Sequence, residues 1–371
     1  MKLLLLSDSN SPHTIRWAKS LGNSGIEVGI FSIHTPNVDL YVDSPKIKLF
    51  SVNVSRNIQN QKETSLSKLV YFKSISAIKK IIKDFKPNVL HAHYASSYGF
   101  LGALTGFHPF LISVWGSDVF GFPNYSIIHK KVIKYALGKA DKVFSTSRIM
   151  EIETRKFTKR EIVTIPFGID TERFKPKIVK RNFDQDAIVI GTIKTLEIRY
   201  GIRYLIEAFA KVKNLIPDKN LKLFIVGQGT LKTSLESLAS KLGISFDTVF
   251  PGYIKHDLVQ DYHNMIDIFC AVSLSESFGV AVLESSACGK PVIVSNVGGL
   301  PEVVDNAKTG FIVESKNIDQ IADAMIILIK NHNLRNEMGK NGREKVINEY
   351  DWNSCVKKMV NEYNYFFKLA I

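Results

Sequence analysis

Short apolar runs alternate with amphipathic segments through the first half of the chain. Apolar residues at helical spacing predict one helix around Ile15, Ala18 and Leu21 and another over Leu66–Phe85. Buried strands are expected at Lys2–Leu6, Glu27–Ile33, Asn88–His93, Phe110–Val114, Lys142–Thr146 and Ile162–Ile165. The polar stretch after the second strand, to about residue 64, has no pattern that assigns an element. Repeated strand–helix alternation is typical of a parallel sheet with helices on both faces.

A polar, proline-containing connector at Thr171–Asp186 interrupts this pattern, and the alternation then restarts. Further strands are expected at Ala187–Ile193, Leu221–Val226, Thr248–Phe250, Ile266–Ser273, Pro291–Ser295 and Phe311–Val313. Helical spacing is found at Tyr204–Val212, Leu231–Leu242, Asp319–Ile329, Leu334–Asn348 and from Trp352 onward. The pattern therefore predicts an α/β protein with two Rossmann-like domains.

The predicted domains are residues 1–170 and 187–349, with a linker at 171–186. A C-terminal helix at 350–371 follows and is expected to pack back on the first domain. Ligands of open α/β sheets bind beyond the carboxyl ends of the strands. We therefore expect both domains to turn those ends toward a cleft between them.

The size and composition fit a folded protein with two cores: 371 residues, 45% of them hydrophobic. No apolar run approaches the roughly 20 residues that cross a bilayer. The apolar start turns polar at Ser7, which favours a first strand over a signal peptide. Cys270, Cys288 and Cys355 are unevenly spaced in apolar surroundings, which indicates core residues of a reducing compartment. A cytoplasmic protein is expected.

The positive charge is concentrated in the first half. Residues 1–170 carry 23 Lys and Arg against 12 Asp and Glu, a net charge of +11, and the remainder carries 26 against 23, a net charge of +3. Such a field attracts anionic lipid surfaces, phosphate-bearing substrates or nucleic acid. Lysines scattered over solvated helix faces would give the same count. No DNA- or RNA-binding motif accompanies the charge, so a nucleic-acid partner is not expected.

Glu276 and Glu284 are the candidate residues on which most of the functional interpretation depends. The first is expected in the loop after the strand Ile266–Ser273, and the second one to two turns into the following helix. The helical part between them spans roughly 9 Å, which suits a ligand held at both ends better than an acid–base pair. The N–H groups at the helix start would favour an anion between the two carboxylates. Two surface glutamates on an amphipathic helix would give the same spacing.

Two glycine turns and two cations lie close to expected strand ends. Gly227 and Gly229 follow a strand, and Gly298 and Gly299 precede a helix, where they would offer bare N–H groups to an anion. Either pair can instead simply make a turn. The cations are Lys194 and Arg199, which flank the loop after the strand Ala187–Ile193 and are suited to a diphosphate or to the plain surface. The G-x-G-x-x-G pattern opens neither domain, which counts against a nicotinamide or flavin enzyme.

His91 and His93 alternate on one strand, so both rings should face the same side. A zinc pair would lack a third ligand nearby, and no metal site is expected. His93 lies closer to the strand end and is the better candidate to face the cleft. Asp184-Gln185-Asp186 has the form of a metal–nucleotide motif, but its place in the connector indicates a solvated linker.

Several motifs, in their order and spacing, resemble those of the large retaining glycosyltransferase family 4. They are Ile190-Gly191-Thr192-Ile193-Lys194 with Tyr200-Gly201, Val226-Gly227-Gln228-Gly229, Pro251-Gly252-Tyr253, Ser275–Glu284 as an E-x7-E motif, Ala287–Val292, and Val297–Glu302. The resemblance covers nearly the whole chain and implies the two-domain GT-B fold. It is greatest to members that build bacterial surface polysaccharides such as lipopolysaccharide.

The resemblance also implies roles for these residues. Glu276 would bind hydroxyls of the donor sugar, Glu284 would bind the ribose, and Lys194 and Arg199 would neutralise the leaving diphosphate. The other donor-side candidates are Gly227, Gly229, Tyr253, Ser277, Phe278, Gly279, Val280, Gly298 and Gly299, with the backbone at Phe278 and Gly279 meeting the diphosphate. No metal ion or other cofactor would be required. Retention in this family is usually assigned to a front-face displacement.

One departure concerns the first domain. The family commonly has His-Gly-Ser-Asp after a strand, and this chain has Trp115-Gly116-Ser117-Asp118. Either His93 or Asp118 takes the role of the missing histidine, or that role is positional and an indole suffices. The loop around His13 and Arg16 differs from the Gly-Gly loop of many relatives and is expected, with Trp115 and Gly116, on the acceptor side.

These observations predict a metal-independent hexosyltransferase that moves a sugar from a UDP- or GDP-sugar to a hydroxyl acceptor. The basic first domain favours a lipid-linked or surface-glycan acceptor at an anionic membrane. A nucleotide-sugar 2-epimerase of the same fold is the alternative, and it would act on the donor alone. A basic nucleic-acid-binding protein is a further alternative that would need a groove-reading motif.

Overall fold

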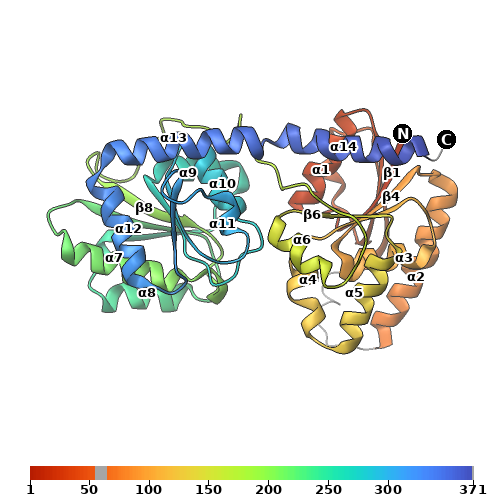
Figure 1. The fold of residues 1–371 in the computed structure, drawn as a ribbon, viewed down its shortest axis with the longest axis horizontal. Helices are drawn as coiled ribbons and strands as arrows, with labels where there is room; N and C mark the ends of the chain where they lie inside the picture. The colour runs from red at the N-terminus through yellow and green to blue at the C-terminus, as the bar shows by residue number, and fades with distance from the viewer. Residues whose placement is uncertain (55–64, 370–371) are drawn as a thin grey trace. The chain divides into compact units, whose positions relative to one another are not determined.

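The computed structural model describes residues 1–54 and 65–369. Its contacts divide the chain into two compact units, each a parallel sheet between helices (Figure 1). Unit 1 is Met1–Pro166 with Ser354–Ile371, and unit 2 is Phe167–Asn353. Both units have the architecture expected from the strand–helix alternation, and the fold is GT-B.

Unit 1 contains a seven-stranded sheet in the order β3-β2-β1-β4-β5-β6-β7. The strands are β1 Lys2–Leu6, β2 Glu27–His34, β3 Ile47–Val54, β4 Val89–His93, β5 Phe110–Ser113, β6 Lys142–Ser145 and β7 Ile162–Thr164. The helices are α1 Pro12–Asn23, α2 Ser65–Phe85, α3 Gly99–Thr105, α4 Ser117–Phe120, α5 Ile127–Lys139, α6 Arg148–Arg155 and α14 Trp352–Leu369, with shorter turns η1 Val38–Tyr41, η3 Tyr94–Tyr98 and η4 Phe122–Asn124.

Most of the expected elements of unit 1 match the observed bounds within a few residues. No bounds were assigned to the helices α3, α4, α5 and α6, and β3 and η1 lie in the polar stretch where no element was assigned. Among the described strands β3 pairs with β2 and lies at the edge of the sheet, so polar residues that face solvent interrupt its apolar pattern. Residues 55–64 of that stretch lie outside the described residues.

Unit 2 contains a six-stranded parallel sheet in the order β10-β9-β8-β11-β12-β13. The strands are β8 Ile188–Ile193, β9 Leu221–Val226, β10 Thr248–Gly252, β11 Ile268–Ala271, β12 Val292–Ser295 and β13 Gly310–Val313. The helices are α7 Ile202–Leu215, α8 Lys232–Lys241, α9 Val259–Met265, α10 Val280–Ala287, α11 Leu300–Val303, α12 Ile318–Lys330 and α13 His332–Glu349, with the turns η5 Ile198–Tyr200, η6 Ser245–Asp247 and η7 His256–Leu258.

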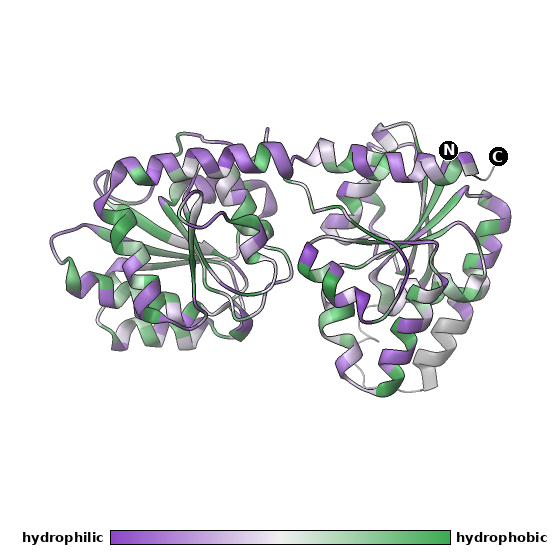
Figure 2. Ribbon diagram, viewed as in Figure 1, coloured by the Kyte–Doolittle hydropathy of each residue, from purple (hydrophilic) through white to green (hydrophobic). Residues whose placement is uncertain are grey.

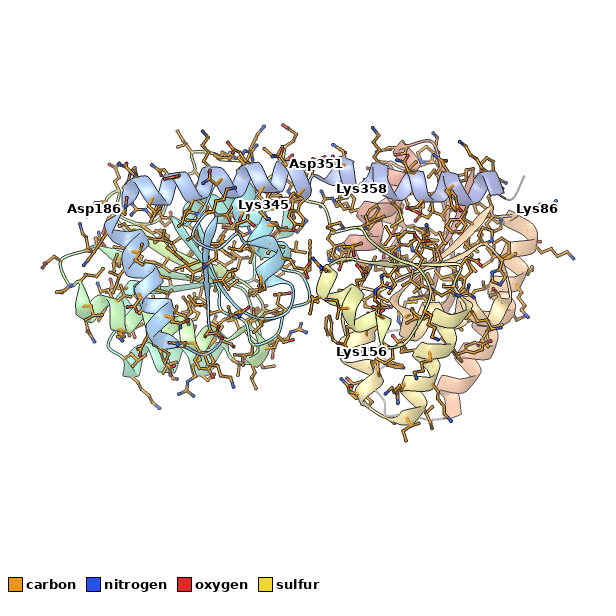
Figure 3. The ribbon with its side chains drawn as sticks, in the orientation of Figure 1. Lys86, Lys156, Asp186, Lys345, Asp351 and Lys358 are labelled. Atoms are coloured by element: carbon orange, nitrogen blue, oxygen red, sulfur yellow. The ribbon has the colours of Figure 1, made fainter. Side chains whose placement is uncertain are left out.

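The central strands are buried on both faces, as parallel sheets require. In unit 1, Leu3 to Leu6 are fully buried, and in unit 2 Phe269 and Cys270 are equally inaccessible. Hydrophobic colour accordingly follows the strands of both sheets (Figure 2). Charged side chains such as Lys86 and Lys156 are exposed and project from the ribbon (Figure 3).

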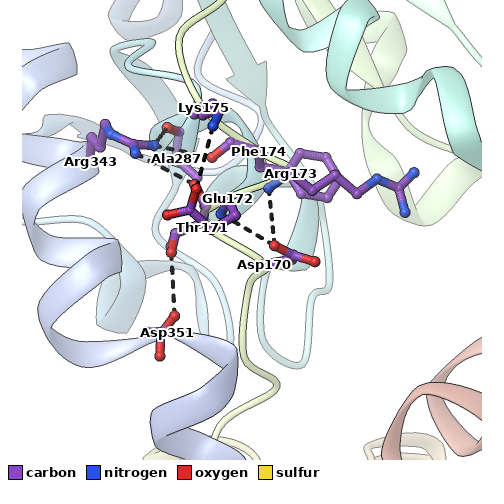
Figure 4. A network of polar contacts seen from close by, with 9 residues as sticks. All are labelled: Asp170, Thr171, Glu172, Arg173, Phe174, Lys175, Ala287, Arg343 and Asp351. Carbon is purple, nitrogen blue, oxygen red and sulfur yellow. Dashed lines mark hydrogen bonds and ion pairs between the residues drawn. The ribbon is translucent and has the colours of Figure 1, made fainter. Parts of the chain in front are cut away.

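The segment after Phe167, which includes the expected linker, is fastened to unit 2. Arg343 of α13 donates hydrogen bonds to the carbonyl oxygens of Thr171, Phe174 and Ala287, and Thr171 bonds to Asp351 (Figure 4). An arginine in this position satisfies three carbonyls with one rigid group. Thr171 and Phe174, near the start of the expected linker, therefore have fixed partners in unit 2.

The last helix begins in unit 2, and its residues from Ser354 onward belong to unit 1. Tyr363 is fully buried, and its hydroxyl lies 2.6 Å from His91 Nδ1 of β4. Lys142 of β6 donates to Glu362 at 3.0 Å. Throughout residues 1–54 and 65–369, the helices are too short or too polar to cross a bilayer.

Candidate functional site

The strand order of unit 2 reverses between β8 and β11. β9 and β10 extend the sheet on one side of β8, while β11, β12 and β13 extend it on the other. Ligands of open α/β sheets bind beyond the carboxyl ends of the strands at such a switch point. Lys194 follows β8 and Glu276 follows β11, and Lys194 Nζ donates to Glu276 Oε2 at 2.6 Å. Their side chains are only 12% and 13% exposed, so two of the predicted residues form a largely buried ion pair at this point.

The turn after β9 supports the loop that carries Lys194. Gly227 has a φ of +140°, and a Cβ there would lie 1.9 Å from the Lys194 carbonyl oxygen. At Gly229 a Cβ would lie 2.4 Å from the Leu196 carbonyl oxygen. Only glycine permits this approach of one backbone to the other. The two glycines therefore position the Lys194 loop.

The turn after β12 supports the Glu276 loop in the same way. A Cβ at Gly298, whose φ is +53°, would lie 1.7 Å from the Glu276 carbonyl oxygen. The Gly299 N–H donates to that same oxygen at 3.0 Å. The expectation of a bare N–H group is therefore wrong for Gly299, because its donor is used within the protein.

Arg199 is exposed, and it shares an aromatic neighbour with Lys194. The Arg199 guanidinium lies 4.7 Å and the Lys194 ammonium 4.9 Å from the centre of the Tyr200 ring. The Arg199 carbonyl accepts the Leu274 N–H at 2.7 Å, which ties the turn after β8 to the loop after β11. Both predicted cations thus lie on one side of the switch point.

Helix α10 connects the two predicted glutamates. Gly279 caps its start with a φ of +111°, and the first N–H groups of a helix have no carbonyl partner within it. The Phe278 side chain is buried near Phe167 and Tyr350, so only its backbone can face a ligand. Ser277 and Val280 are half-buried beside it.

Glu284, 14% exposed, has a neighbour that the sequence did not reveal. Its Oε2 lies 3.4 Å from Nε2 of the fully buried His263 of α9. The two residues lie on different helices, so no spacing rule could pair them. Tyr253 is 71% exposed and follows Gly252, whose carbonyl accepts the Gly227 N–H.

Unit 1 has its own switch point, between β1 and β4. Ser7 follows β1, and its hydroxyl lies 3.0 Å from His93 Nδ1 at the end of β4 and 2.7 Å from the Thr14 hydroxyl. Burial lowers the pKa of His93 well below its ordinary value, so its ring is neutral near pH 7. His93 therefore lies at the edge where it was predicted.

Trp115 packs on His93 at the same edge. The two ring centres are 4.2 Å apart, and those of Tyr94 and His13 lie 5.3 Å and 5.8 Å from the indole. Gly116, with a φ of +130°, turns the chain directly after Trp115. Arg16 lies half-buried on α1, about one turn from the start of the helix. The structure thus gathers His13, His93 and Trp115.

The Asp118 carboxylate holds the backbone of its own loop and of the turn after β4. Its carboxylate accepts the N–H groups of Ala95, Trp115 and Gly116 at 2.9, 3.2 and 2.9 Å. Burial raises its pKa, against the opposing effect of these N–H groups. Both oxygens hold backbone, which argues against Asp118 as a free catalytic base and explains why an acid follows Trp115-Gly116-Ser117.

His91 also points into the protein. Its Nε2 lies 2.8 Å from the Ser113 hydroxyl, opposite the contact with Tyr363. Burial lowers its pKa to about 3. In the described part of the chain, no three His, Cys, Asp or Glu residues gather closely enough to hold a metal ion.

Two family models match the chain in succession. Residues 2–147 match "Glycosyl transferase 4-like", and residues 174–345 match "Glycosyl transferases group 1". The matches fall in unit 1 and unit 2 respectively.

The chain is also similar to relatives that are named for a sugar-transferring activity. The chain is 29% identical, over 74% of its length and 73% of the relative's, to N-acetyl-α-D-glucosaminyl L-malate synthase of Bacillus anthracis. It is 30% identical, over 53% of its length and 54% of the relative's, to a GDP-mannose-dependent α-(1-6)-phosphatidylinositol monomannoside mannosyltransferase of Mycobacterium tuberculosis. Among solved structures, HepE of Anabaena in complex with UDP is similar with a TM-score of 0.80, 16% identity and coverage of 98% and 100% of the two chains. The last similarity shows the fold alone.

Proposed function

Because the chain belongs to the group 1, or family 4, glycosyltransferases, we propose that it transfers a hexose from a nucleotide-sugar to a hydroxyl acceptor with retention of configuration. The observation that carries the proposal is the ion pair of Lys194 and Glu276 at the switch point of unit 2, with Glu284 on the helix that follows.

The donor would lie along α10. Glu276 binds hydroxyls of the sugar, the backbone at Phe278 and Gly279 receives the diphosphate, and Glu284 binds the ribose. His263 approaches one oxygen of Glu284 and leaves the other for a ribose hydroxyl. Tyr253 and the half-buried Ser277 and Val280 complete the donor side.

Lys194 and Arg199 would act on the leaving group during the transfer reaction. The bond between C1 and the phosphate oxygen breaks, and its electron pair goes to the departing nucleoside diphosphate. A bond from C1 to the acceptor oxygen forms on the same face, and the acceptor proton passes to the leaving phosphate oxygen. Lys194 and Arg199 stabilise the negative charge that develops there, which is the largest single contribution available to such a site.

In unit 1, the neutral His93 and Trp115 form the surface that replaces the usual histidine. The indole covers one side of the imidazole, while Ser7 holds Nδ1. We assign Trp115 a positional role and His93 the polar one, with His13, Arg16 and Gly116 on the acceptor side. The acceptor is a lipid-linked or surface-glycan precursor, and the enzyme works in the cytoplasm at an anionic membrane.

Both donor nucleotides remain within this proposal, since one relative is named for GDP-mannose and one structural neighbour holds UDP. A thermal-shift screen against UDP-, GDP-, ADP- and TDP-sugars tests it, because a ligand that binds the native state raises the melting temperature. One nucleotide should raise it for the wild type, and Glu284→Ala should lose most of that shift. Full donor affinity in Glu284→Ala would refute the assignment of the donor site.

A further inference from the structure

Three large apolar side chains are exposed at the start of α5. Tyr125 is 75%, Ile127 76% and Ile128 72% exposed, and they follow one another along the chain with only Ser126 between them. Isolated exposed apolar residues are common on proteins, whereas a group of them marks a contact site.

Lysines follow this apolar tip, which is formed by Tyr125, Ile127 and Ile128, along the helix. Lys130, Lys131 and Lys134 are exposed, and α5 shows alternating hydrophobic and hydrophilic bands (Figure 2). Residues 119–140 contain four lysines and no Asp or Glu. The local positive charge therefore has no acidic neighbour in this segment to cancel it.

More cations adjoin the second half of α5. Arg160 donates to the Gly138 carbonyl at 2.9 Å, which brings the chain after α6 against α5. Lys134, Lys156, Lys159 and Arg160 line one hollow there; Lys156 is marked in Figure 3. Lys156 pairs with Glu153 at 2.6 Å, so the uncompensated charge comes mainly from the other three.

Contacts with their neighbours hold Tyr125 and the first turn of α5 in a defined conformation. His129 packs on Phe122 and Tyr125 with ring centres 4.6 and 5.7 Å apart. Ser126 caps α5 by accepting the His129 N–H, and its hydroxyl lies 2.7 Å from His129 Nδ1. Ordering Tyr125 on a surface therefore costs little additional entropy.

The position of the tip connects it with the acceptor side of unit 1. The chain leaves β5 at the carboxyl edge of the sheet, passes Trp115 and Gly116, and forms α4 and η4 before α5 begins. In a parallel α/β unit the helix that returns to the next strand starts at this edge. The exposed apolar residues thus begin at the edge where the acceptor is expected.

We propose that this surface, Tyr125, Ile127 and Ile128 with Lys130, Lys131 and Lys134, docks unit 1 on an anionic lipid bilayer. The apolar tip enters the interface and the ammonium groups meet lipid phosphates. An aromatic and two aliphatic side chains complement a bilayer surface when they lie in front of lysines that have no carboxylate partner among the described residues. This docking rests on the proposed function, which supplies the lipid-linked acceptor. The residues of the surface would hold the enzyme beside that acceptor.

The test is flotation of the full-length chain with phosphatidylcholine vesicles, with and without about 30 mol% phosphatidylglycerol, at low and high salt. The wild type should float only with the anionic vesicles and at low salt. Each lysine near the surface contributes about fivefold to binding, so K130E/K131E/K134E should weaken it on the order of a hundredfold or more. Y125S/I127S/I128S should weaken binding at low salt as well.

Matched variants in unit 2 provide the control. K219E/K241E/K330E changes the net charge equally, and I178S/F246S removes side chains that are 100% and 98% exposed. Both should float like the wild type. Equal losses in these variants, or no flotation of the wild type, would overturn the proposal. So would a dimer in solution that the tip variant abolishes, because the patch would then bind a second copy.

The donor thermal shift is measured on the same variants and should not change. Loss of the shift in the wild type would instead count against the proposed function, so the two failures are distinguishable.

Discussion

Lys194 and Glu276 hold each other in place before any donor arrives. Their 2.6 Å contact is largely shielded from water, and removing one partner of such a pair is destabilising in its own right, by up to about 3–5 kcal/mol for a fully buried pair. The discount for their partial exposure brings the expected cost nearer to about 2 kcal/mol. A loss of activity on mutation must therefore be separated from a loss of stability.

Lys194→Gln is best compared with Lys222→Gln. Lys222 pairs with Asp247 at 2.7 Å in the same unit, with side chains 21% and 23% exposed, and has no place in the proposed site. Lys194→Gln should lower the free energy of unfolding by about 1–2 kcal/mol, and Lys222→Gln should lower it by less, because Asp247 keeps its second partner Lys213 at 2.8 Å. Only Lys194→Gln should lower kcat, by about 100- to 1,000-fold, because a cation is missing where charge develops. Chemical denaturation and donor turnover measure the two effects, and equal turnover in both variants would remove Lys194 from the reaction.

Individual site residues were predictable where a strand end exposes them. Lys194 and Glu276 follow apolar strands, so the alternation alone brings them to one edge of the sheet. His263 was not predictable, because its contact with Glu284 depends on how α9 packs on α10. Asp118 was predicted as a candidate catalytic residue from its motif. Its three backbone N–H partners are formed only by the folded loop, so the sequence could not show them.

Among the elements, the two glycine turns determine how closely the loops of unit 2 approach each other. The sequence left open whether these turns bind a ligand or only reverse the chain. Their Cβ positions would fall on the carbonyl oxygens of Lys194 and Glu276, so the turns act through the loops that they support. Spacing rules contain no information about such contacts between segments far apart in the sequence.

Gly298→Ala tests this role against Gly243→Ala. Both glycines have a positive φ, of +53° and +73°, but a Cβ at Gly243 has nothing within 4 Å. The conformational cost, about 1 kcal/mol, is therefore common to both. Gly298→Ala should in addition displace Glu276 and raise KM for the donor at least about tenfold. The measurement is donor KM with a melting curve; an unchanged KM in Gly298→Ala would show that the contact is dispensable.

The contact of β4 with α14 predicts a pH dependence. The pKa of His91 is about 3 in the folded protein and near 6.5 when unfolded, so the unfolded state binds a proton that the folded state does not between those values. Stability is full above about pH 6.5 and falls on acidification by up to about 1.4 kcal/mol per pH unit for this group.

His91→Gln keeps a polar partner for Tyr363 and removes the titration. Between about pH 6.5 and pH 4 its unfolding free energy should fall roughly half as steeply as that of the wild type, since His93 still contributes. His332→Gln, at an exposed position, is the control and should keep the full slope. An unchanged slope in His91→Gln would assign the acid sensitivity to other groups.

At the scale of the whole molecule, both units repeat one plan. Each is a parallel sheet whose strand order reverses at one place, and a polar contact lies at each reversal: Ser7 with His93, and Lys194 with Glu276. Periodicity predicted the α/β class, the two units and most strands, because buried parallel strands are continuous apolar runs. It did not predict β3, an edge strand with polar residues, or the hydrogen bonds from Arg343 to the carbonyl oxygens of Thr171 and Phe174.

The most direct test of the central claim is a proton NMR time course of the enzyme with its best donor in D2O, with water as the only acceptor. A retaining transferase should release the nucleoside diphosphate slowly, with the α-anomer of the sugar appearing first, and Lys194→Gln should abolish this release. A β-anomer appearing first, or an epimerised sugar carrying deuterium at C2, would contradict the account, and the second result would identify a 2-epimerase.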